Sequence, residues 1–138
     1  MWKRTNMNYT PENKRELTRR YLRIANKRLK SAHASINVGS FEDAVSRCYY
    51  AILDAATALL ILKDIVPKSH EGAMRLFSLH YIKPGTIPQE YQRLFSKMEK
   101  MRLEADYFHE REFTREEATE AISMAERFVK MAEKMVGG

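Results

Sequence analysis

The segment from residue 41 to residue 62 constrains the fold most strongly, because it is apolar in nearly every helical direction. At about 100° per residue, its apolar side chains point almost all round the helix axis rather than to one face. They are Ala44, Val45, Cys48, Tyr49, Ile52, Ala55, Ala56, Leu59 and Leu60. A helix of this kind is stable only when other elements surround it. We therefore expect it to be the central and most buried helix of the chain.

The segment before it has the pattern of an amphipathic helix that packs on this centre. Thr10 can cap its start, and Pro11 suits the first helical position. Apolar residues then recur at a spacing of three to four, which places them on one face. They are Leu17, Tyr21, Ile24, Ala25, Leu29, Ala32 and Ile36. We expect Gly39 to end this helix and Ser40 to cap the next one.

Three further helices are predicted at about residues 69–81, 88–108 and 114–137. A loop rich in proline and glycine separates the first two. Thr114 and Glu117 have the spacing of a capping box at the start of the last helix.

Together these patterns predict an all-α fold, an up-and-down antiparallel bundle of four to five helices. We find no alternating pattern of useful strand length, no internal repeat and no low-complexity segment. A chain of 138 residues can bury one core and leaves little room for a second domain. We expect residues 1–9 to form a basic tail and residues 10–138 to form a single domain.

Several kinds of enzyme site are absent from the sequence. The five glycines are scattered, so there is neither a P-loop nor a dinucleotide-binding fingerprint. No histidine lies in a His-Glu-x-x-His or Glu-x-x-His pattern. Cys48 is the only cysteine, and on an apolar helix it is expected to be a buried, inert thiol. We expect no cofactor and no metal ion.

The composition is typical of a protein of the reducing cytoplasm. A single cysteine excludes a disulfide framework within the chain. The start of the chain is basic and polar, without the apolar core of a signal peptide. The richest apolar stretch, residues 51–62, is short for a membrane span and contains Asp54. We expect no membrane association.

Positive charge is concentrated in the first helix and the tail before it. Residues 1–38 hold ten Lys or Arg and two acidic residues, whereas residues 39–138 hold fourteen and sixteen. Such a basic stripe can attract a nucleic acid backbone, RNA for example, or an acidic protein. The alternative is an ordinary solvated helix face.

Near the end of the fourth predicted helix, Arg102, Asp106 and His109 fall within about 60° of one another. They lie at the edge of that helix's apolar stripe, so we expect them to be partly desolvated and convergent. An arginine, a carboxylate and an imidazole can act on a phosphate as anion clamp, orienting group and acid or base. Alternatively, Arg102 and Asp106 are a helix-stabilising ion pair, and His109 is a cation near the helix C-terminus.

Three segments resemble one protein family. They are Ser46-Arg47-Cys48-Tyr49-Tyr50-Ala51 on the central helix, Lys68-Ser69-His70-Glu71-Gly72, and Arg102-Leu103-Glu104-Ala105-Asp106-Tyr107. In this order they are similar to small HEPN-domain proteins, and the last matches the Arg-x-x-Ala-Asp-Tyr pattern of an uncharacterised branch. The resemblance covers about residues 17–136.

This resemblance implies a bundle of four to five helices that is frequently a homodimer. Many HEPN proteins are ribonuclease toxins in which four to six residues lie between an arginine and a histidine, and six residues lie between Arg102 and His109. Others are partners of small nucleotidyltransferases. By resemblance, Arg47, Tyr50 and Tyr107 are expected to be binding residues.

Tyr49 and Tyr50 are adjacent on the central helix and therefore point about 100° apart. We expect Tyr49 to be in the core and Tyr50 to lie nearer the surface or a dimer contact.

Two functions from different classes remain open. The first is a metal-independent endoribonuclease, the toxin of a paired system, whose active site is completed in a homodimer. The second is a non-catalytic binding module that partners a separately encoded minimal nucleotidyltransferase or binds a nucleotide. A helical scaffold without a ligand is a third possibility.

Overall fold

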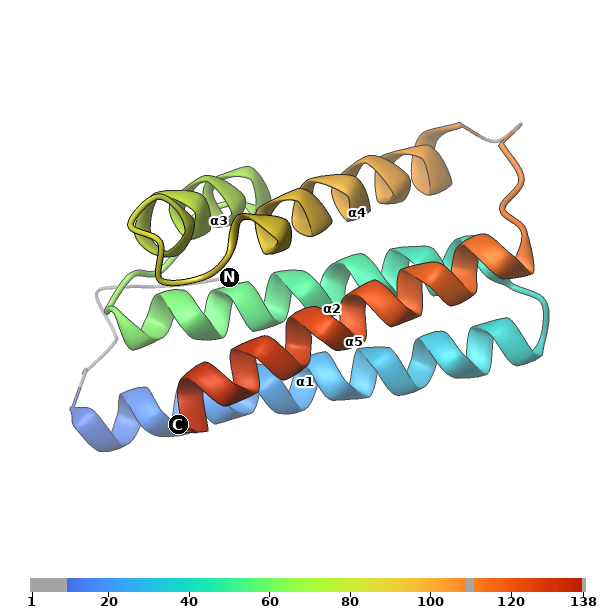
Figure 1. The fold of residues 1–138 in the computed structure, drawn as a ribbon. Helices are drawn as coiled ribbons and strands as arrows, with labels where there is room; N and C mark the ends of the chain where they lie inside the picture. The colour runs from blue at the N-terminus through green and yellow to red at the C-terminus, as the bar shows by residue number, and fades with distance from the viewer. Residues whose placement is uncertain (1–9, 109–110, 138) are drawn as a thin grey trace.

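The computed structural model describes residues 10–108 and 111–137, and all regular structure in these ranges is helical. The elements are α1 (Pro11–Asn37), α2 (Phe41–Leu62), α3 (His70–Phe77), a π-helical turn η2 (Ser78–Ile82), α4 (Gln89–Tyr107) and α5 (Arg115–Gly137). The long helices lie side by side, and successive ones run in opposite directions (Figure 1). The predicted up-and-down antiparallel bundle is confirmed.

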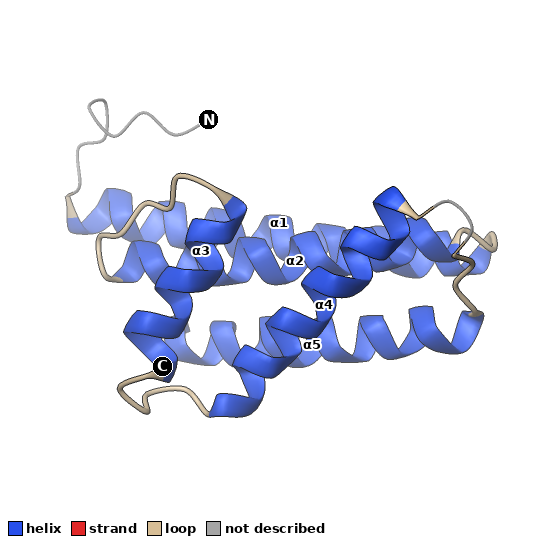
Figure 2. Ribbon diagram, turned by 90° about the horizontal axis from the view of Figure 1, so that it is seen from above, coloured by secondary structure: helices blue, strands red, loops and turns tan. Residues whose placement is uncertain are grey.

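Helix α2 is the centre of the bundle, as its apolar pattern predicted. Every residue from Ala51 to Ile61 is buried. Helix α2 packs against α1, α3, α4 and α5. Helix α1 lies on one side of it, and α3 and α4 lie on the other (Figures 1 and 2). Most of α1 therefore faces a different side of the bundle from α4.

Helix α2 is also the one helix in the described ranges that is long and apolar enough to cross a membrane. Its most apolar window is 78% buried within the bundle. That burial is typical of the core helix of a globular protein, so the length and hydropathy of α2 need no membrane to explain them.

The predicted capping box at the start of α5 is present. The Thr114 backbone N–H donates to Glu117 Oε1 at 2.9 Å, and the Glu117 N–H donates to Thr114 Oγ1 at 3.1 Å. Hydrogen bonds from Arg111 and then from the Thr114 backbone lower the pKa of Glu117 to about 2. At the start of α1, Thr10 Oγ1 likewise accepts the Asn13 N–H at 3.1 Å.

Ser40 occupies the capping position of α2, but its side chain makes no capping hydrogen bond. Only three residues separate α1 from α2, and the turn is closed by Gly39 at φ +80 and by a bond from the Ser40 N–H to the Ser35 carbonyl at 2.8 Å. This tight turn holds Ser40 at ψ 76, away from the extended backbone that a capping serine normally adopts.

The short helix predicted to reach Tyr81 changes type on the way. It is α-helical to Phe77 and continues as a π-helical turn to Ile82. Tyr81 and Ile82 are both buried there, and the Tyr81 hydroxyl donates to the Leu59 carbonyl of α2 at 2.5 Å. Burial raises the pKa of Tyr81 to about 12. The π-helical turn therefore occurs where Tyr81 packs on α2. The periodicity of the local sequence does not indicate this change of helix type.

Candidate functional site

The C-terminal part of α4 lies against the N-terminal part of α2 and brings Arg102 and Asp106 to three α2 side chains. Arg102 Nη1 lies 3.4 Å from Asp106 Oδ2, one helical turn away. The Ser46 hydroxyl donates to Asp106 Oδ1 at 3.0 Å. Asp106 therefore joins the two helices and holds the guanidinium from one side.

Two tyrosine rings hold Arg102 from the other side. The Arg102 Cζ lies 4.8 Å from the Tyr49 ring centroid and 6.0 Å from that of Tyr50. Both distances are within the range of cation–π attraction. The Arg102 side chain is 11% exposed, whereas that of Asp106 is 35% exposed. The solvent-facing side of this ion pair is therefore at Asp106.

Hydrogen bonding in this cluster is incomplete. Arg102 Nε and the Tyr49 hydroxyl are both buried and have no hydrogen-bond partner of normal geometry among the described residues. Burial raises the pKa of the Tyr49 phenol, and the adjacent Arg102 offsets part of the rise. Burial also opposes the Arg102 charge, but Asp106 and Tyr49 outweigh it and raise the guanidinium pKa above its usual value. Arg102 is therefore a fixed, permanent cation.

The different roles predicted for the two tyrosines are confirmed. Tyr49 is fully buried, whereas Tyr50 is half-buried. The Tyr50 ring meets the Arg28 guanidinium at 5.5 Å and the His70 ring at 5.6 Å, measured between centroids for the rings. Tyr50 thus connects the Arg102 cluster to α1 and to the start of α3.

Arg28 and Asp54 form a second polar group that the sequence did not identify as a site. Arg28 Nε lies 2.5 Å from Asp54 Oδ2, and the Asp54 side chain is 12% exposed. Burial raises the pKa of Asp54, while Arg28 lowers it in part. Asp54 and His70 border a small pocket of about 230 Å³ between α2 and the start of α3. The available signal is a charged residue, Asp54, inside the apolar stretch of residues 51–62.

His109 lies outside the described residues, so its expected closeness to Arg102 stays a prediction. The helical geometry that placed it beside Arg102 ends at Tyr107, and Phe108 already has non-helical angles of φ −109 and ψ 85. The expectation that α4 runs through Phe108 is therefore wrong by one residue.

The predicted binding residues Arg47 and Tyr107 are exposed. Within the described residues, neither forms a hydrogen bond, ion pair or cation–π contact with Arg102, whereas the third predicted binding residue, Tyr50, lies 6.0 Å from its guanidinium. Tyr107 instead belongs to an exposed apolar patch at the end of α4. The patch consists of Leu103, Tyr107 and Phe108, which are 40%, 67% and 60% exposed. Large apolar side chains exposed together often mark a contact with another molecule.

Two other chemistries receive no support from the described part of the chain. Cys48 is fully buried, and burial raises its thiol pKa to about 12, as expected for an inert cysteine. Within residues 10–108 and 111–137, no group of three or more His, Cys, Asp or Glu side chains is arranged to hold a metal ion.

Comparison with known proteins identifies the family. The HEPN domain matches residues 18–135. The chain is 37% identical over 120 residues to "Putative toxin MJ0605" of Methanocaldococcus jannaschii, covering 87% of this chain and 89% of the relative. It is 31% identical over 121 residues to "Putative toxin MJ0142" of the same organism, covering 88% and 82%. A UPF0332 protein of Thermotoga maritima is 28% identical over 123 residues, covering 89% and 93%. The chain therefore belongs to the HEPN domain family.

Proposed function

We propose that this chain is the toxin of a paired system and acts as a metal-independent endoribonuclease in a homodimer. The observation that carries the proposal is the Arg102 cluster, in which a fixed and mostly buried cation has one long ion pair, at 3.4 Å, with a partly exposed carboxylate. Such a cation is suited to an anionic ligand. Two similar proteins that are named as toxins add to this support.

In the proposed reaction, the 2′-oxygen of RNA attacks the adjacent phosphorus atom. The 2′-hydroxyl gives its proton to a base, the bond from phosphorus to the 5′-oxygen breaks, and the leaving oxygen takes a proton. Arg102 binds the phosphoryl oxygens and stabilises the charge that develops on them. Asp106 fixes the orientation of Arg102, and His109 moves the protons.

The homodimer completes this site in the proposal. Each chain contributes one His109, whereas removing one proton and delivering another is simplest with two imidazoles. A second copy that covers Leu103, Tyr107 and Phe108 would bury the exposed patch beside Asp106 and bring the two sites together. The basic residues of α1 add long-range attraction for RNA in a cytoplasmic setting.

A specific observation favours the alternative function of a binding module. The Arg102 side chain is only 11% exposed and contacts two tyrosines, as a structural arginine would. In that case the exposed patch would contact a minimal nucleotidyltransferase or help to bind a nucleotide, and no RNA would be cut.

RNA cleavage in the presence of a chelator separates the two functions. We expect the wild-type protein to cut RNA and His109→Ala to lose about a hundredfold or more in rate. Arg93→Ala, an exposed substitution on the same helix as Arg102, is the matched control and should retain activity. Light scattering should give the mass of a dimer at micromolar concentration. A monomer, or cleavage that is unchanged in His109→Ala, would refute the proposed active site.

A further inference from the structure

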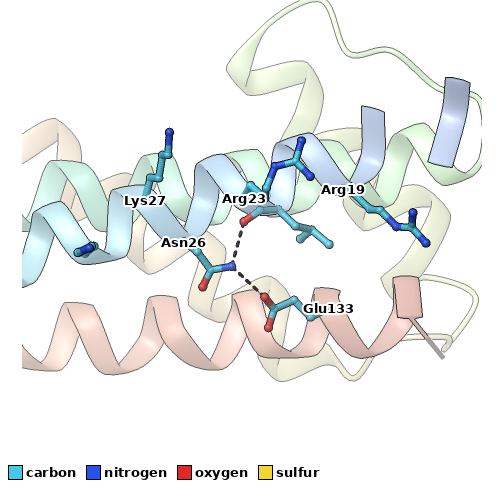
Figure 3. A pocket seen from close by; sticks show the side chains of 7 residues that line it. Arg19, Arg23, Asn26, Lys27 and Glu133 are labelled. Carbon is cyan, nitrogen blue, oxygen red and sulfur yellow. Dashed lines mark hydrogen bonds between the residues drawn. The ribbon is translucent and has the colours of Figure 1, made fainter. Parts of the chain in front are cut away.

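A groove of about 550 Å³ lies between α1 and α5, away from the Arg102 cluster. Figure 3 shows that its lining side chains come mostly from one face of α1, with Glu133 of α5 opposite. Helix α1 is on the other side of α2 from α4 (Figures 1 and 2). The groove therefore shares no lining residue with the proposed ribonuclease site.

Four cations border this groove: Arg19, Arg23, Lys27 and Lys30. They extend over about 16 Å of α1, given a rise of about 1.5 Å per residue. All four side chains are exposed, and none forms an ion pair within residues 10–108 and 111–137. Lys14 and Arg28 of the same helix do have carboxylate partners. The groove thus presents an uncompensated row of positive charge.

The single acidic side chain that lines the groove, Glu133, is hydrogen-bonded to Asn26 on the facing helix. The Asn26 amide nitrogen donates to Glu133 Oε2 at 2.8 Å and to the Leu22 carbonyl at 3.0 Å (Figure 3). Glu133 is therefore bonded to a neutral amide rather than to one of the cations, and four cations against one carboxylate leave the groove with an excess of positive charge.

The floor of the groove is apolar. Leu22 lies at its base, and the alkyl stems of the surrounding Arg and Lys side chains extend the apolar surface. Apolar surface below a charged rim is typical of a groove that receives an amphipathic helix. The helix places its apolar side chains on the floor and its charged edge against the rim.

We infer that the α1/α5 groove docks an acidic amphipathic helix of a partner protein. Carboxylates spaced one turn apart on that helix match cations spaced one turn apart on α1, namely Arg19, Arg23 and Lys27. A single-stranded RNA fits less well, because none of the lining residues is aromatic and the groove therefore offers no ring on which a base can stack. The inference does not depend on RNA cleavage.

The test uses a fluorescent helical peptide of about four turns, with leucines on one face and glutamates along its edge. Its binding is measured by anisotropy at physiological salt on the full chain. Arg23→Glu with Lys27→Glu reverses the charge of the groove. Arg15→Glu with Arg20→Glu changes the net charge equally at exposed positions of α1 that do not line the groove. A peptide with serine in place of leucine, and an oligouridylate RNA, are tested in parallel.

We expect the leucine peptide to bind, and Arg23→Glu with Lys27→Glu to weaken it by at least about tenfold. The Arg15→Glu, Arg20→Glu control should change the affinity less, and the serine peptide should bind at least about tenfold more weakly. No binding, equal weakening by both double variants, or equal affinity for both peptides would overturn the inference. Groove-dependent binding of the RNA without binding of the peptide would overturn it in favour of a nucleic acid site.

Discussion

The two ends of α2 differ in whether their buried polar groups have hydrogen-bond partners. Toward its C-terminal end, the Asp54 carboxylate is paired with Arg28, and the Thr57 hydroxyl donates to the Leu53 carbonyl at 2.9 Å. Tyr81 supplies a further hydrogen bond to this end of α2. The buried polar side chains here have partners, so this end has the character of a completed core.

At the N-terminal end of α2, the buried polar groups are not all satisfied. The Tyr49 hydroxyl and the Arg102 Nε beside it have no hydrogen-bond partner among the described residues. Leaving such groups unpaired costs about 1–3 kcal/mol each, and native proteins contain few of them. The difference indicates that the C-terminal end of α2 stabilises the fold, whereas its N-terminal end is organised around Arg102.

The largest effect is expected from removing core volume at the C-terminal end of α2. Leu59 is fully buried, so Leu59→Ala should lower the free energy of unfolding by about 3 kcal/mol. Leu79→Ala, at an exposed position outside the proposed dimer contact, is the control and should change it by no more than about 0.5 kcal/mol. Urea unfolding measures both variants. Equal losses would show that the core is not centred on α2.

A matched pair of hydroxyl deletions then compares the two ends directly. Tyr81→Phe removes the hydrogen bond to the Leu59 carbonyl and should cost about 1–2 kcal/mol. Tyr49→Phe removes a hydroxyl that has no partner, so it should cost nothing or stabilise the fold by up to about 1 kcal/mol. Thermal unfolding of the two variants gives the comparison. If Tyr49→Phe costs as much as Tyr81→Phe, the two ends do not differ.

The smallest expected effect is the pH dependence that Asp54 contributes. Its pKa in the folded protein is raised from 3.8 by burial, so the folded state keeps this proton to higher pH than the unfolded chain does. Stability from this group is therefore present at low pH and falls as pH rises above about 4 through the folded-state pKa. The Tm of the wild type minus the Tm of Asp54→Asn should therefore decrease as pH rises over that range. An increase would show that Arg28 outweighs burial.

Most of the fold could be predicted because the signals for it are local. The capping box of Thr114 and Glu117, the turn at Gly39 and the all-round apolar pattern of α2 each act within a few helical turns. The π-helical turn at Tyr81 and the missing Ser40 cap could not be predicted. The first accompanies packing on α2, and the second follows from the geometry of a three-residue connection.

Less of the candidate site could be predicted. Arg102 and Asp106 were found because their spacing places them one turn apart on the same helix. Arg28 and His70 were missed because they reach Tyr50 from other helices, and no sequence spacing records that contact. The angle expected for His109 rests on a helix that continues past Phe108, whereas α4 ends at Tyr107.

The most direct test of the account pairs RNA cleavage with thermal stability in wild type, Arg102→Ala and Arg102→Lys. We expect Arg102→Ala to reduce chelator-resistant cleavage by about a hundredfold or more. The ion pair with partly exposed Asp106 adds little to stability, but the mostly buried Arg102 side chain also packs on two tyrosines, so we expect a moderate loss of Tm that leaves the variant folded in the assay. Arg102→Lys should rescue cleavage poorly, because lysine lacks the planar fork of donors. Cleavage by Arg102→Ala near the wild-type rate, or a large loss of Tm without any RNA cleavage in the wild type, would contradict the catalytic role of Arg102.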